Sequence, residues 1–180
     1  ASKRPQGVNT PAGISAAALM VRSTTAIAYA AVVLGALWFG PLATAAVFGV
    51  MASMAAGELY AFTRREARPP NELLGVVAAA AMPISAAVWG FAGLASVVTA
   101  LGIASLVLHT SFLRLRAADT AVTVFGAIYV GFFLGHLVMV RSLESGLILS
   151  FAVMLSVWVA DLFAFVRSEE RRVGEDCRYR

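Results

Sequence analysis

Long runs of uncharged residues alternate along this chain with short clusters of charge. Residues 23–57 and 73–113 contain no Asp, Glu, Lys or Arg, and they are 35 and 41 residues long. About 20 apolar residues are enough to cross the ~30 Å hydrocarbon core of a bilayer, so each of these runs predicts a hairpin of two membrane helices. Two shorter uncharged runs, 120–140 and 145–160, each predict one further span.

The pattern predicts an all-α, polytopic membrane protein with about six transmembrane helices in three hairpins. We expect the spans at 24–39, 42–62, 73–90, 94–113, 120–140 and 145–166. Gly40-Pro41 and residues 89–93 suit the first two turns, because Pro sets and Gly permits the backbone angles of tight turns. Composition agrees: 60% of the residues are hydrophobic, 13% are charged and the mean hydropathy is +0.83, whereas soluble domains carry about 25% charge.

Three segments of different composition divide the chain. Residues 1–22 are polar and form an expected N-terminal arm without regular structure, 23–166 form the transmembrane domain, and 167–180 form a charged tail. The lone Cys177 excludes an internal disulfide framework and a multi-cysteine metal site.

Basic residues gather on one side of the predicted membrane domain. The opposite side has only Arg141, whereas the first side collects eight: Lys3, Arg4, Arg22, Arg64, Arg65, Arg68, Arg114 and Arg116. By the positive-inside rule the first side is cytoplasmic, and so are both termini. Because these residues lie at span ends and not in one patch, the net charge of +4 does not indicate nucleic-acid binding.

Two acidic residues, Glu58 and Asp161, lie within predicted spans. A carboxylate at the bilayer centre costs about 2.5–3.5 kcal/mol, so such residues tend to mark function. Both run toward the predicted cytoplasmic face, where two carboxylates could meet and hold Mg²⁺. Glu58 as an interfacial cap and Asp161 as a structural ion-pair partner remain open alternatives. His109 and His136 are predicted to be helix–helix hydrogen-bond partners and not ligands.

Four stretches resemble the phosphatidate cytidylyltransferases, or CDP-diacylglycerol synthases, over about 22–166. They are the Arg-led segment 22–27, the acidic-aromatic segment 57–60, the Gly-x-x-Tyr-x-Gly segment 126–131, and the Trp-Val-Ala-Asp segment 158–161, which is the most specific. The resemblance implies that Asp161 is catalytic and binds metal, and that Glu58, Arg22 and Tyr129 bind substrate.

The resemblance also implies an activity and a location. The family condenses CTP with phosphatidate in the presence of Mg²⁺ and releases pyrophosphate and CDP-diacylglycerol. We therefore expect CTP, phosphatidate and membrane lipid as partners, no nucleic acid, and the bacterial cytoplasmic (inner) membrane as the location. A homodimer is left open.

The end of the chain departs from the family pattern. The Ser-Pro-Lys-Lys segment and the later signature of the family do not follow the Asp161 helix, and residues 167–180 resemble a translated sequencing adapter. We therefore expect a non-native tail after the N-terminal portion of a cytidylyltransferase, inactive by itself.

Two other classes compete with the enzyme. A small transporter or permease subunit would need polar residues at the membrane midplane, where this chain has mostly Ala, Val and Leu. A non-enzymatic membrane scaffold would leave Asp161 unexplained.

Overall fold

The computed structural model describes residues 16–64, 71–111 and 117–178, and their regular structure is all helical. The elements are α1 (Ala16–Phe39), α2 (Pro41–Thr63), α3 (Glu72–Ser111), α4 (Ala117–Ala127), the π-helical turn η1 (Ile128–Phe132), α5 (Phe133–Arg141) and α6 (Gly146–Arg178). The predicted all-α class is confirmed. The expectation that residues 1–22 lack regular structure is wrong for residues 16–22, which are the first turns of α1. Residues 1–15 lie outside the described part.

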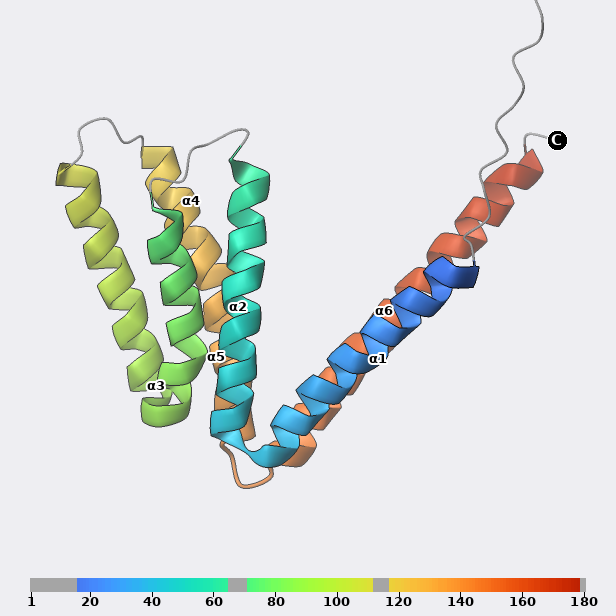
Figure 1. Cartoon of the computed structure of the whole chain (residues 1–180), viewed down its shortest axis with the longest axis horizontal. Helices are drawn as coiled ribbons and strands as arrows, with labels where there is room; N and C mark the ends of the chain where they lie inside the picture. The colour runs from blue at the N-terminus through green and yellow to red at the C-terminus, as the bar shows by residue number, and fades with distance from the viewer. Residues whose placement is uncertain (1–15, 65–70, 112–116, 179–180) are drawn as a thin grey trace, which may run out of the picture.

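Helix α3 turns back on itself at Gly90. This residue has φ 60° and ψ −141°, a conformation that suits glycine because it has no Cβ. The two limbs of α3, before and after Gly90, lie side by side and run in opposite directions (Figure 1). The turn predicted at residues 89–93 is therefore present.

Four helical stretches in the described part are long and apolar enough to cross a membrane. They are Pro41–Thr63, Glu72–Ser111, Ala117–Arg141 and Gly146–Ala164, and Ser23–Phe39 is a shorter apolar helix. These stretches indicate an integral membrane protein. The count of six crossings stays a prediction, because it treats the limbs of α3 separately and includes the shorter helix.

The helices form two parts, which we call the bundle and the arm. The bundle contains α2, α3, α4, η1 and α5, and the arm contains α1 and α6 (Figure 1). The arm helices run side by side and lean away from α2 as they leave the turns at Gly40 and 142–145. The reversal of α3 lies at this same end of the bundle, and the C-terminal ends of α2 and α3 lie at the opposite end (Figure 1).

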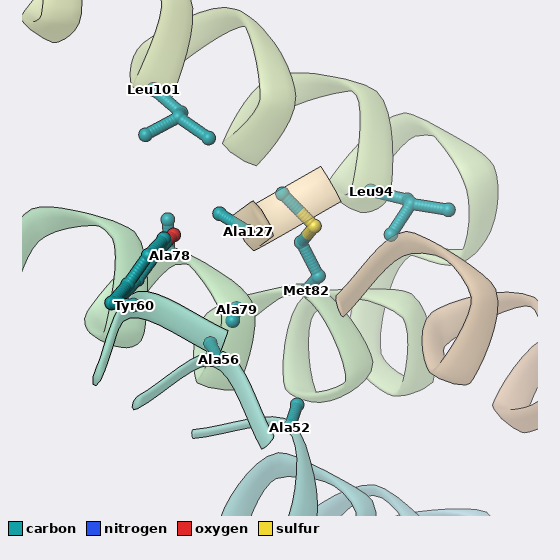
Figure 2. Close-up of a cluster of buried hydrophobic side chains, with 9 residues drawn as sticks. All are labelled: Ala52, Ala56, Tyr60, Ala78, Ala79, Met82, Leu94, Leu101 and Ala127. Atoms are coloured by element: carbon teal, nitrogen blue, oxygen red, sulfur yellow. The ribbon is translucent and has the colours of Figure 1, made fainter. Parts of the chain in front are cut away.

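The described residues form two buried hydrophobic clusters. The bundle cluster combines large and small side chains, which are Ala52, Ala56, Tyr60, Ala78, Ala79, Met82, Leu94, Leu101 and Ala127 (Figure 2). Small residues let helix backbones approach closely in lipid. The second cluster joins the arm to the bundle and contains Val33, Leu37, Ala45, Phe48, Ala86 and Val138.

Candidate functional site

The two glycines of the Gly-x-x-Tyr-x-Gly segment face the interior of the bundle. A Cβ on Gly126 would lie 2.6 Å from Cε1 of Tyr60, and a Cβ on Gly131 would lie 2.8 Å from Cα of Ala79. Real Cβ atoms do not approach other atoms so closely. Both glycines therefore serve the close packing of α4 and η1 on α2 and α3.

Tyr129 points the other way. Its side chain is 56% exposed and stacks on Phe125, with ring centroids 5.6 Å apart and planes 17° apart. Phe133 meets it edge to face at 6.1 Å. Tyr129 lies on the π-helical turn, a rare conformation that is frequent at functional sites. Its role in substrate binding stays a prediction.

A buried polar link, which sequence reasoning missed, joins α2 to α4. The hydroxyl of Tyr60 donates to the carbonyl oxygen of Thr123 at 2.6 Å. Asp119, one turn earlier on α4, is only 7% exposed, and its backbone carbonyl accepts from the Thr123 hydroxyl at 3.2 Å. A carboxylate in the first turn of a helix is favoured by the helix dipole. Asp119 and Thr123 are four residues apart and so lie on one face of α4. This spacing was the sequence signal that could have indicated a polar, buried face.

The structure does not bring Glu58 and Asp161 together. Glu58 is exposed on α2, opposite the buried row formed by Ala52, Ala56 and Tyr60. Asp161 is exposed on α6, which leans away from α2 along its length (Figure 1). Within the described residues, neither carboxylate has a hydrogen bond or an ion pair.

Arg64, the basic residue nearest to Glu58 in the sequence, is engaged elsewhere. Its guanidinium binds both carboxylate oxygens of Glu72, with Nη2–Oε2 at 2.6 Å and Nε–Oε1 at 2.9 Å. This pair links the end of α2 to the start of α3. Glu58 therefore gains no compensation from Arg64.

Arg22, Glu58 and Asp161 lie at similar positions along their helices. At about 1.5 Å per residue, each is roughly 22–26 Å from the end of the structure that carries the Gly40 turn. Arg22 and Asp161 belong to neighbouring helices of the arm, and Glu58 belongs to the bundle. The side chain of Arg22 lies outside the described part, so only its place on α1 is assigned.

The two histidines have different partners. His109 Nδ1 lies 3.3 Å from the Thr120 hydroxyl, a contact between α3 and α4, as predicted for a helix–helix partner. His136 Nδ1 lies 2.9 Å from the carbonyl oxygen of Phe132 one turn earlier, so this bond stays within one continuous helical stretch. Among the described residues, no group of three or more His, Cys, Asp or Glu could hold a metal ion.

The fold and the apolar helices define a polytopic helical membrane protein. Residues 20–167 match the cytidylyltransferase family, and this range contains Arg22, Glu58, Tyr129 and Asp161. The chain therefore belongs to the cytidylyltransferase family, that of the CDP-diacylglycerol synthases. No curated protein and no solved structure matches the chain significantly.

Proposed function

We propose that this chain is the N-terminal membrane part of a phosphatidate cytidylyltransferase that makes CDP-diacylglycerol for phospholipid synthesis. The observation that carries the proposal is the family match over residues 20–167, which includes the Trp-Val-Ala-Asp segment. Asp161 supports it, because a carboxylate exposed on a membrane helix without a partner among the described residues is costly unless it serves a function.

The proposed reaction transfers a cytidylyl group. A phosphate oxygen of phosphatidate attacks the α-phosphorus of CTP, the new P–O bond forms, and the bond to the departing pyrophosphate breaks. Catalysis of such a transfer consists mainly of positioning the reactants and neutralising their charge. We assign substrate contacts to Glu58, Arg22 and Tyr129, and catalysis to Asp161.

The residues present are compatible with Mg²⁺ in one respect. Mg²⁺ takes oxygen ligands and is commonly held by one or two carboxylates together with water and substrate phosphates. Asp161 offers one unpaired carboxylate, and a bound Mg²⁺ would neutralise part of the triphosphate charge. Asp161 would hold the ion near the end of the arm far from the Gly40 turn, which is the proposed cytoplasmic end at which the lipid headgroup lies.

The proposal also includes an orientation with six membrane crossings. The end of the bundle that carries Arg64 would face the cytoplasm, because the basic residues gather there. In a Cys177→Ser background, Phe62→Cys and Leu143→Cys place single thiols at exposed positions near opposite ends. An impermeant reagent added outside intact cells should label position 143 and not position 62. The reverse pattern would overturn the orientation.

A chimera tests the activity. Residues 1–166 would replace the corresponding spans of an active family member, and pyrophosphate release would be measured with CTP, phosphatidate and Mg²⁺. We expect Mg²⁺-dependent release from the chimera and none above background from the 180-residue chain alone. An inserted, folded chimera without turnover would contradict the proposed function.

A further inference from the structure

The arm joins the bundle at the turns at Gly40 and 142–145, which we call the root of the arm. The end of α1 at this root lacks one backbone donor. In a continuous helix the carbonyl of Leu37 would accept from the N–H of residue 41, but that residue is Pro41 and has no N–H. Gly40, with φ 119°, ends α1 at this point. The Leu37 side chain is fully buried. A carbonyl left without a donor beside this packed root would be costly.

Two side chains donate hydrogen bonds at this helix end. Arg141, the last residue of α5, donates from Nε to the carbonyl oxygen of Leu37 at 2.7 Å. The hydroxyl of Thr44 lies 3.0 Å from the carbonyl oxygen of Ala36 and 2.8 Å from that of Gly40. The Arg141 charge also lies at the C-terminal ends of α1 and α5, where the helix dipoles favour a cation.

Beyond its root the arm has little support from the bundle. Only 6% of an 18-residue apolar segment within Gly146–Ala164 is buried, against 33% of the corresponding segment in Pro41–Thr63. Exposed apolar side chains continue along both arm helices, among them Ile27, Val32, Leu155 and Leu162. The angle between arm and bundle is therefore determined at the root, where the second hydrophobic cluster packs and Arg141 meets Leu37.

A small rotation at the root becomes a large displacement further along the arm. Asp161 is 15 residues beyond Gly146, or about 22 Å at 1.5 Å per residue, so a rotation of about 10° moves it by about 4 Å. Displacements of this size decide whether a carboxylate reaches a substrate held elsewhere.

We propose that Arg141 is a positioning residue that sets the angle of the arm, and thereby the distance between Asp161 and the bundle, through its hydrogen bond to the Leu37 carbonyl. The catalytic meaning of that distance rests on the proposed function. The effect of Arg141 on the angle of the arm does not depend on the proposed function. It also gives a role to Arg141, which ends α5 at the end of the bundle opposite Arg64.

Distances between spin labels test the angle directly. Labels at Met54 and Val157 span bundle and arm, and labels at Met54 and Ile103 span the bundle alone, all at exposed positions. Measurements use the 180-residue chain in nanodiscs, with Cys177→Ser. Arg141→Met keeps an apolar stem and removes the donor. We expect the arm distance to shift or broaden by about 3 Å for each 10° of rotation, with the bundle distance unchanged.

The controls separate a local effect from general damage. Glu144→Gln alters a charge in the adjacent turn, where Glu144 is exposed, and should leave both distances unchanged. Arg141→Lys, which restores a cationic donor, should recover part of the wild-type arm distance. If Arg141→Met does not insert, Arg141→Leu, which also lacks a donor, repeats the comparison.

The result distinguishes the two proposals. An unchanged arm distance in a folded Arg141 variant overturns the positioning role and leaves the proposed function standing. A changed arm distance, combined with an inactive chimera, supports the positioning role and removes only the proposed function.

Discussion

The bundle and the arm are built from similarly apolar helices, yet they are stabilised differently. In the bundle, glycine and alanine allow close backbone contact, and Tyr60 fills the space between α2, α3 and α4. In the arm, two helices run side by side, and within the described residues they meet the bundle at the root. Apolar composition therefore defines membrane helices, whereas small residues at matching positions decide which of them form a tightly packed group.

The largest difference in stability between the two parts should appear when a methyl group is added to one glycine in each of them. Gly131→Ala places a Cβ 2.8 Å from the Ala79 backbone, and overpacking of this kind costs about 1–3 kcal/mol. Gly35→Ala in the arm meets nothing within 4 Å and should be neutral or stabilising by up to ~1 kcal/mol through helix propensity. Detergent-titration unfolding followed by circular dichroism measures both. Equal losses would remove the distinction between the parts.

Asp161→Asn tests whether the arm carries the chemistry. The substitution keeps the shape of the side chain and removes its charge. In the active chimera we expect turnover to fall at least about tenfold, or ~1.4 kcal/mol of barrier, while insertion and helix content persist. Glu144→Gln is the matched control, because Glu144 is an exposed carboxylate in the turn before α6. Normal turnover in the Asn variant would leave Asp161 with only a structural role.

Removing one hydroxyl in each part sharpens the comparison. Tyr60→Phe loses the bond to the Thr123 carbonyl, and we expect a loss of about 0.5–1.5 kcal/mol in the free energy of unfolding. Tyr29→Phe in the arm removes a hydroxyl from a side chain that is 48% exposed, and it should have little effect. The same unfolding titration applies. A larger loss at Tyr29 would show that the arm has polar packing of its own.

The smallest effect is expected at the rim of the bundle. The side chains of Arg64 and Glu72 are 60% and 34% exposed, and exposed ion pairs contribute about 0.2–1 kcal/mol. A double-mutant cycle with Arg64→Gln and Glu72→Gln should give a coupling energy in this range, and the coupling should weaken in high salt. A coupling well above it would mean that this pair, and not the buried cluster, joins α2 to α3.

The sequence predicted the helices and turns better than the site. Gly90 marks the observed reversal because few residues other than glycine adopt its backbone angles. The predicted start of the first helix was wrong, because Arg22 placed residues 16–22 with the polar N-terminal segment. Residues 16–21 are Ala, Leu, Met and Val, and the whole stretch is helical. The structure leaves Glu58 and Asp161 on separate parts, although a linear pattern put both near one face.

The packing roles of residues within the motifs could not be predicted from the sequence either. Tyr60 and Tyr129 are both tyrosines close to glycines, and only the contacts distinguish the buried one from the exposed one. The bond between Arg141 and Leu37 joins residues 104 positions apart, which no local pattern indicates.

The sequence by itself determined that this chain is helical, apolar enough for a membrane, and a member of the cytidylyltransferase family. Charge is costly in lipid, so its absence marks spans without any knowledge of their neighbours. Only the tertiary structure decided that α1 and α6 leave the bundle as an arm, and that Arg141 joins the two parts. Those outcomes depend on which surfaces fit together, and such contacts form between residues far apart in the chain.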